Sequence, residues 1–285
     1  MAPQQFGAGR AVFDDRRIGM ALAAPAALFV ALAFILPVAV LLSGGFQGVD
    51  GWTLARFAEF AEEPLYREVF WRTVKLGALV TLTSAVLGYA TALAIVDAGP
   101  TWKGRWSGLV MLPLMISPVA RTYAWIVLLG RTGFVNQVIT GLGLSAEPLR
   151  LLFTETAVFI GLVQLFLPLM VLSLVSALEN LPADVVPAAR VLGARWPTVF
   201  FRVLLPLSRE GLVIGGTLVF TGSVTAYITP AVLGGSKVLM LETLLYQRVS
   251  VASDFASASV IALILIVMSV VTHALLKRAS SARKR

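Results

Sequence analysis

The sequence has 285 residues, of which 58% are hydrophobic and only 13% are charged, and this balance excludes an ordinary soluble domain. The net charge of +8 does not indicate nucleic-acid binding, because the basic residues interrupt apolar runs instead of gathering among aromatic residues on one surface. The absence of cysteine excludes disulfides, thiolate metal sites and cysteine nucleophiles. We therefore predict an all-α integral membrane protein embedded in a lipid bilayer.

The chain begins with a polar and basic segment, residues 1–17, and an apolar run follows from residue 18. This run is longer than the core of a signal peptide, about 7 to 15 residues, and about 20 residues suffice to cross a bilayer. Residues 43–71 carry aromatic side chains at amphipathic spacing and are expected on the outer surface. Six membrane spans are predicted, at residues 18–42, 73–96, 108–130, 155–178, 210–232 and 255–276.

Several polar or aromatic residues inside the spans form a candidate translocation path. Arg121 lies roughly 20 Å into the third span at 1.5 Å per residue, and an arginine at that depth needs a partner. It either lines the path with Tyr123 and Trp125, or it pairs with backbone carbonyls or reaches outward to the interface. The candidate path residues are Tyr89, Arg121, Tyr123, Trp125, Gln164, Ser223, Thr225 and Tyr227.

The loop at residues 179–209, which follows the fourth span, is too ordered in its pattern to be a simple linker. Asp184 is placed to cap a short helix, and Pro187 then falls at the third helical position, where a missing N–H costs no intrahelical bond. The helix is expected to extend to about Arg195. Its small residues with flanking arginines predict a surface that docks against another protein. The candidate docking residues are Asp184, Pro187, Ala188, Ala189, Arg190, Leu192, Gly193, Arg195 and Pro206.

In the fifth span, polar residues alternate with apolar ones before Pro230, so this helix is expected to end or break there beside a hydrated cavity. Gly211 and Gly215 have the spacing of a helix-packing motif, for which ordinary close packing is favoured over a dimer face. The sixth span ends in a basic tail, residues 277–285.

The distribution of charge predicts the orientation in the membrane. If residues 1–17, 97–107, 179–209 and 277–285 face the cytoplasm, that side holds 14 of the 23 basic residues. Because cytoplasmic loops are enriched in lysine and arginine, both termini are expected in the cytoplasm.

The chemistry of catalysis is missing from the pattern. No GxxxxGK[ST] phosphate-binding motif occurs, so ATP is not expected to bind this chain by that route. The only histidine, His273, lies near the inner end of the last span, where an interfacial role is favoured over catalysis. No acidic residue lies in the middle of a span, which disfavours a carrier coupled to ions or protons. We predict a transport protein with no catalytic residues, no metal site and no bound cofactor.

Three stretches in the same order resemble permease subunits of bacterial ABC importers. Ala188-Ala189, Gly193 and Leu205-Pro206 sit at the spacing of the cytoplasmic signature loop of that family, although Pro187 stands where the family usually has glutamate. The segments RTYAWIVLLGRTGFVNQ and YITPAVLGGSKVLMLETLLYQ narrow the resemblance to the spermidine/putrescine type. The likeness covers nearly the whole chain after the first span.

The resemblance implies a type I ABC importer permease fold of the MetI-like class in the bacterial inner membrane. It also implies three kinds of partner: a second permease subunit, identical or different; two ATPase subunits that bind ATP-Mg and grip the signature loops; and an extracytoplasmic solute-binding protein. Spermidine or putrescine is the first expected substrate, with a zwitterionic or anionic solute such as an aminophosphonate as the alternative. A self-sufficient carrier or channel is the alternative of a different class.

Overall fold

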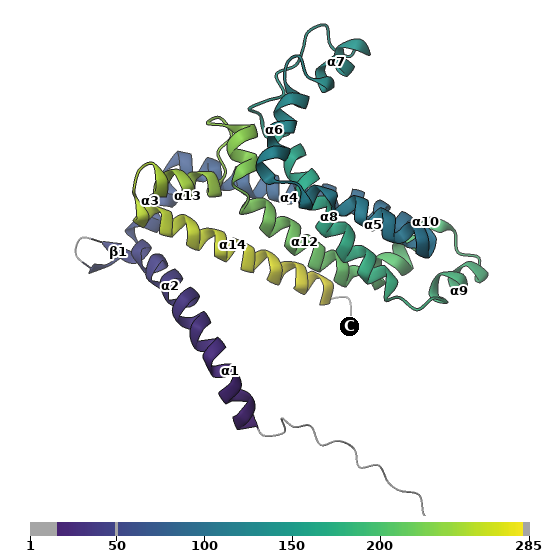
Figure 1. The fold of residues 1–285 in the computed structure, drawn as a ribbon, viewed down its shortest axis with the longest axis horizontal. Coiled ribbons are helices and arrows are strands. Elements are labelled where there is room, and N and C mark those ends of the chain that lie inside the picture. Colours follow the sequence, from purple (N-terminus) through teal and green to yellow (C-terminus); the bar gives the residue numbers. More distant parts are fainter. Residues whose placement is uncertain (1–15, 49–50, 282–285) are drawn as a thin grey trace, which may run out of the picture.

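The computed structural model describes residues 16–48 and 51–281, most of which are helical (Figure 1). The elements are α1 (Arg16–Val30), η1 (Ala31–Ile35), α2 (Leu36–Ser43), η2 (Gly44–Phe46), β1 (Gln47–Gly48), β2 (Gly51–Trp52), α3 (Ala55–Glu62), α4 (Pro64–Asp97), α5 (Gly99–Met115), α6 (Pro118–Leu129), α7 (Phe134–Gly141), α8 (Glu155–Glu179), α9 (Val185–Val191), α10 (Trp196–Val199), η3 (Phe200–Leu204), α11 (Leu205–Leu207), α12 (Arg209–Val224), η4 (Pro230–Gly234), α13 (Leu241–Ser250) and α14 (Phe255–Ser281). The predicted segment at residues 1–17 and the tail at 277–285 lie partly outside the described residues.

The core of the bundle is formed by α4, α8 and α12, which pack against one another, with α14 along α12. Gly211 and Gly215 of α12 allow this packing. A Cβ atom on Gly211 would lie 2.8 Å from the carbonyl oxygen of Ser173, and one on Gly215 would lie 2.7 Å from the sulfur of Met170, both on α8. The glycine pair is thus used for close packing within the chain, as the sequence favoured.

Four helical stretches are long and apolar enough to cross a membrane, and the number rises to six if each of two bent pairs counts as one span. The four are Leu22–Phe46, Pro64–Asp97, Glu155–Glu179 and Phe255–Arg278. They overlap the first, second, fourth and sixth spans expected from the sequence. The third and fifth expected spans correspond to the bent pairs.

The third expected span, residues 108–130, is not straight. α5 ends at Met115, α6 begins at Pro118, and the two helical stretches meet at an angle of 92°. The physical reason is Pro118: the helical region is sterically disfavoured for the residue before a proline, and Ser117 accordingly has ψ of 129°. The run therefore contains a sharp bend that hydropathy alone does not reveal.

The fifth expected span, residues 210–232, also differs. α12 ends at Val224, six residues before Pro230, and Pro230 instead begins the short π-helix η4. On the other side, the stretch Trp196–Leu207 meets α12 at an angle of 69°. α12 is thus bounded by a break at each end.

Ion pairs and backbone contacts join the elements at the end of the bundle opposite α9. The carboxylate of Glu155, at the start of α8, accepts hydrogen bonds from Arg72 Nε at 3.0 Å and Lys75 Nζ at 2.5 Å, both on α4. Arg72 also donates to the carbonyl oxygen of Leu239, which precedes α13. Asp254 accepts from the backbone of Ser257 at 3.0 Å at the start of α14, and its hydrogen bonding to Ser257 lowers the pKa of the Asp254 carboxyl.

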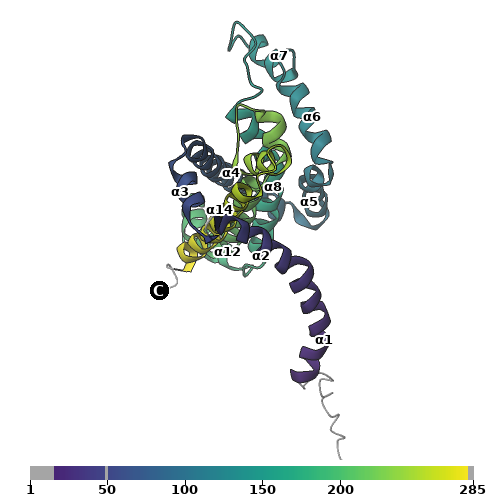
Figure 2. The ribbon, with the colours of Figure 1, turned by 90° about the vertical axis from the view of Figure 1, so that its left-hand side faces the viewer.

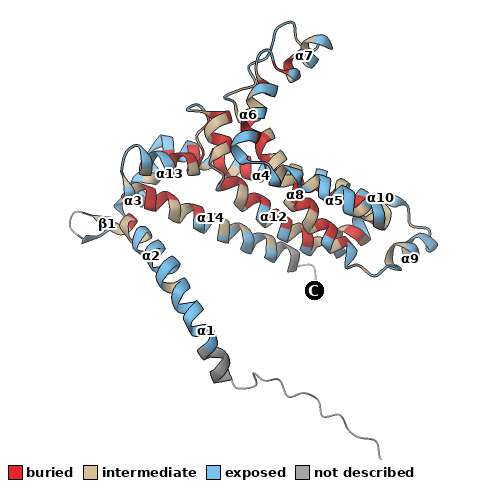
Figure 3. Ribbon diagram, viewed as in Figure 1, coloured by how far each residue is buried: buried red, intermediate tan, exposed pale blue. Residues whose placement is uncertain are grey.

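Two parts of the chain project from the bundle: the arm formed by α1, η1 and α2, and the extension formed by α6 and α7 (Figure 2). No residue in the apolar window of Leu22–Phe46 is buried (Figure 3). The arm is attached at its base, where Ser259 of α14 donates a hydrogen bond to the carbonyl oxygen of Leu41 at 2.7 Å. Most of its apolar surface meets no other part of the described chain.

Candidate coupling surface and transport path

The short helix α9, Val185–Val191, lies at one end of the bundle (Figure 1). Asp184 is the residue before the helix, but its side chain makes no capping hydrogen bond; its backbone carbonyl accepts from Ala188 N at 2.8 Å instead. The predicted side-chain cap is therefore absent. Pro187 is the third residue of α9, where the first-turn N–H groups have no intrahelical partner.

The helix ends earlier than the expected Arg195 because Gly193 turns the backbone. Gly193 has φ of +81°, a left-handed conformation that glycine adopts without steric cost. The amide of Gly193 donates to the carbonyl of Arg190 at 2.9 Å, and that of Ala194 donates to Ala189 at 3.0 Å. This pair of bonds is a Schellman motif, which satisfies the last carbonyls of the helix.

The tip of this turn exposes apolar side chains. Val191 is 87% exposed and Leu192 is 88% exposed, although both are aliphatic. Pro187 and Ala188 are also exposed, whereas Ala189 packs against the core. A compact apolar surface presented away from the bundle is a feature of sites that bind another protein.

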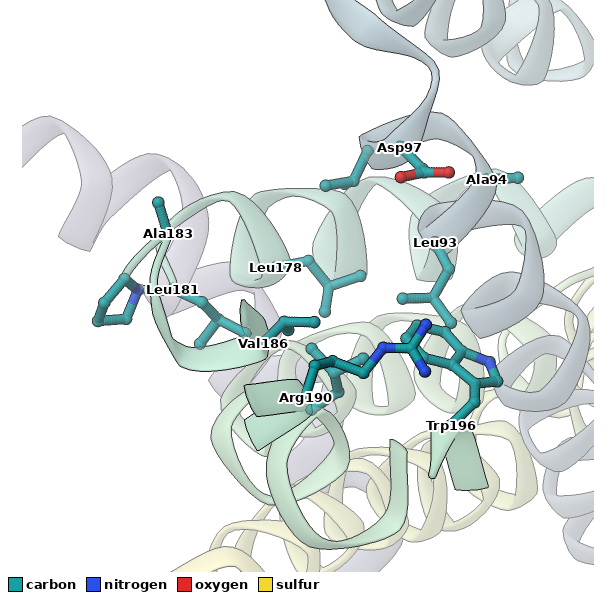
Figure 4. Close-up of a pocket in the computed structure, with 12 residues that line it drawn as sticks. Leu93, Ala94, Asp97, Leu178, Leu181, Ala183, Val186, Arg190 and Trp196 are labelled. Carbon is teal, nitrogen blue, oxygen red and sulfur yellow. The ribbon is translucent and has the colours of Figure 1, made fainter. Parts of the chain in front are cut away.

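Arg190 lines a cavity beside α9, with its side chain directed toward Trp196 (Figure 4). The cavity has a volume of about 730 Å³ and lies between α9 and the ends of α4 and α8, with Asp97 and Leu178 in its lining. The guanidinium carbon of Arg190 is 5.8 Å from the centre of the Trp196 ring, within the range of a cation–π contact. Arg190 and Arg195 are both exposed to solvent.

A buried contact joins the segment after α9 to the bundle. Pro206 lies in α11, and Ser208 follows at the bend before α12. The hydroxyl groups of Ser208 and Tyr89 are 2.5 Å apart, and the ring of Tyr89 meets that of Phe200 edge-on at 5.0 Å. Tyr89 was expected on the path, but here it is buried in the core and packs against the bend. Sequence reasoning missed Ser208, whose signal was the polar run of residues 208–210 two residues after Pro206, typical of a helix boundary.

Arg121 is buried at the bend between α5 and α6. The carbonyl of Pro113 would accept a bond from Ser117 N if α5 continued, but the helix ends before that bond can form. Arg121 Nη1 donates to this carbonyl at 2.8 Å. Its Nη2 is buried and has no hydrogen-bond partner among the described residues. The structure therefore contains the pairing with a backbone carbonyl, one of the two alternatives left open by the sequence.

The structure brings only some of the other path candidates together. Trp125 Nε1 donates to Gln164 Oε1 at 3.3 Å, which links α6 to α8. The ring of Tyr227 lies 4.4 Å from that of Tyr246 on α13, a partner the sequence analysis did not include. Among the described residues, the other candidates form no hydrogen bond or ring contact with these pairs: Tyr123 is exposed, Ser223 is buried and bonds to Val219 O, and Thr225 is exposed and bonds to Thr221 O.

Comparison with known families decides what this architecture belongs to. Residues 84–285, which include α9 and all of the path candidates, match the family described as the binding-protein-dependent transport system inner membrane component. The chain belongs to this family of permeases. The arm of α1 and α2 lies outside the matched region.

Among its relatives, the permease is 32% identical over 240 residues to the spermidine/putrescine transport system permease protein PotB of Haemophilus influenzae, and the alignment covers 82% of this chain and 84% of that protein. PotB of Escherichia coli is also 32% identical, over 179 residues that cover 63% of this chain and 65% of that protein. The permease is therefore homologous to permease subunits of ABC importers.

Solved structures show the same fold. A bacterial ABC transporter that imports the acidic polysaccharide alginate has a chain that superposes with a TM-score of 0.77 at 15% identity, covering 94% of this permease and 96% of that chain. The MetNI methionine ABC transporter gives a TM-score of 0.56 at 18% identity, covering 76% of this permease and 95% of that chain. The predicted type I importer permease fold is confirmed.

Proposed function

We propose that this permease forms, with a second permease subunit, the membrane path of an importer that takes up spermidine or putrescine. The solute is delivered by an extracytoplasmic binding protein, and two separate ATPase subunits bind ATP-Mg and drive the cycle. The observation that carries the proposal is the exposed apolar tip of α9, Val191 and Leu192, at the end of a bundle homologous to PotB.

In this proposal the ATPase holds α9, and its movement reaches the bundle through buried contacts. The segment from Trp196 to Leu207 follows α9 directly and meets α12 at the Ser208 bend. The Tyr89–Ser208 contact ties that bend to α4. A rigid displacement of α9 is thus transmitted to α4 and α12, two of the three core helices, because packed interiors shift as units.

The second permease is proposed to cover the apolar surfaces that this chain leaves open. Phe29 and Phe34 on the arm and Met115 at the bend are each about two thirds exposed or more, at 71%, 69% and 78%. Lipid and a second subunit can share this surface, because lipid-facing side chains need no protein partner.

The choice of polyamine over an aminophosphonate rests on the groups the structure leaves available. The anionic alternative depended on Arg121, whose Nη1 is bonded to Pro113 O, so that only its Nη2 lacks a partner among the described residues. The rings of Tyr227 and Tyr246, and that of Trp125, instead offer aromatic faces, which attract ammonium groups. The polyamine is the substrate that these side chains fit better.

Uptake of labelled spermidine into proteoliposomes is expected to require the permease pair, the ATPases, the binding protein and hydrolysable ATP together. Omitting any one component, or substituting a non-hydrolysable nucleotide, should reduce uptake to the level of empty liposomes, because the permease has no nucleotide site of its own in this scheme. Spermidine uptake by the permease alone would instead support a self-sufficient carrier or channel.

The proposed orientation predicts opposite labelling of two exposed threonines. The chain has no native cysteine, so single variants Thr101→Cys and Thr132→Cys report one site each. In intact spheroplasts an impermeant maleimide should label Thr132→Cys and not Thr101→Cys, and lysis should expose the second. The reverse pattern would invert the topology and place α9 outside.

A further inference from the structure

A second cavity, of about 350 Å³, lies where the end of α6, the loop before α8 and the segment after η4 meet. Its lining contains three cations, Arg131, Arg150 and Lys237, and no acidic residue; the rest is leucine and phenylalanine. By the proposed orientation this cavity opens on the extracytoplasmic side. We call it the cationic cavity.

A buried side chain holds two walls of the cationic cavity together. Asn136 of α7 is 1% exposed. Its Nδ2 donates to the carbonyls of Gly130 and Leu149 at 2.9 and 3.1 Å, and its Oδ1 accepts from Leu149 N at 2.8 Å. These bonds position the residues that precede Arg131 and Arg150, so the two cations are set by a rigid support.

The third wall is fixed through Phe153. This residue has φ of +59°, uncommon for a bulky side chain, and its amide donates to the carbonyl of Leu233 at 2.9 Å. A Cβ on Gly235 would lie 2.9 Å from the Phe153 ring, so the backbone that leads to Lys237 passes closely over it. The strained loop and the close approach bring Lys237 to the same cavity.

The three cations have no ion pair or side-chain hydrogen bond among the described residues. Arg72 and Lys75, by contrast, share the carboxylate of Glu155. Like charges gathered in one cavity repel one another unless an anion joins them. All three are exposed to solvent, and an oxyanion that contacts them together would reduce their mutual repulsion.

We propose that the cationic cavity is a docking site for carboxylate side chains on the surface of the solute-binding protein. This inference rests on the proposed importer function. The cavity shares no lining residue with the path candidates, so its anion is not supplied by a solute in the path. Three uncompensated positive charges on the extracytoplasmic side would repel a polyamine, which is itself a cation. The carboxylates of a docked binding protein would neutralise these charges when the solute is delivered.

The test measures binding of the purified solute-binding protein, encoded with the permease, to the assembled permease–ATPase complex in nanodiscs. Arg131→Ala, Arg150→Ala and Lys237→Ala should each weaken binding by about two- to fivefold, the range of exposed ion pairs. The triple variant should weaken it by more than any single one and flatten its dependence on NaCl. Arg67→Ala, an exposed cation at the start of α4 outside the cavity, is the matched control and should leave binding unchanged.

The outcomes separate this inference from the function itself. Co-purification with the ATPases and maximal uptake at saturating binding protein should be normal in the variants. If binding of the solute-binding protein is unchanged in the triple variant, or if the variants alter only the response to inorganic phosphate or to phosphatidylglycerol in the nanodisc, the docking site is wrong while the importer function stands. If the complete wild-type system shows no ATP-dependent uptake of spermidine, the proposed function itself is wrong.

Discussion

Gly193→Ala is expected to weaken binding of the ATPase subunits by about tenfold, although it adds only one carbon to an open surface. A Cβ at Gly193 meets nothing within 4 Å, so the cost is conformational. A residue other than glycine at φ of +81° is strained by roughly 1–2 kcal/mol, and relief of that strain opens the Schellman turn that presents Leu192. Binding of purified ATPase to the permease in nanodiscs measures the effect.

Two further substitutions distinguish the effect of backbone strain at residue 193 from the effect of side-chain size. Gly193→Asn should bind the ATPase nearly as well as the wild type, because asparagine tolerates the left-handed conformation. Gly193→Trp adds bulk at the docking surface to the same strain and should abolish both binding and transport. Equal, mild losses of ATPase binding for the alanine and asparagine variants would show that the turn at Gly193 does not position the docking surface. Wild-type binding and transport by the tryptophan variant would show that α9 does not couple the ATPase to the permease.

Arg121→Ala is expected to lower the stability of the permease and to reduce its assembly with partner subunits. The substitution leaves the partly buried Pro113 carbonyl without its donor, which costs up to about 1–3 kcal/mol. It also removes the cation from the C-terminal end of α5, where the helix dipole favours positive charge. The melting temperature of the purified permease and the yield of co-purified ATPase measure the two effects.

Three control variants test whether the hydrogen-bond donor of Arg121 is what stabilises the permease. Arg121→Gln and Arg121→Lys each retain an N–H group and should recover part of the stability, whereas Tyr123→Ala, on the exposed neighbouring position, should leave the melting temperature unchanged. An Arg121→Ala permease with normal stability and assembly but no transport would mean that the arginine acts on the solute path, and the structural role would be withdrawn.

The sequence by itself determined the class of protein and the approximate position of most helices. A long apolar run in a membrane protein can adopt few structures other than a helix. The backbone in lipid must satisfy its own hydrogen bonds, and a helix does so within one segment. α8 and α14 accordingly begin at the residues expected from hydropathy. The start of α9 was also located correctly at Asp184, since its small residues and Pro187 are local signals.

The tertiary structure alone decided where the spans bend and what the polar side chains inside them contact. Hydropathy averages over a window, so it carries no information about the 92° turn at Ser117. A hydrogen bond depends on the position of its partner: Arg121 reaches the carbonyl that this turn leaves free, and Tyr89 reaches Ser208, which lies 119 residues away in the sequence. Polarity and depth predicted that such residues need partners, but only the packing of the helices determines which partners are within reach.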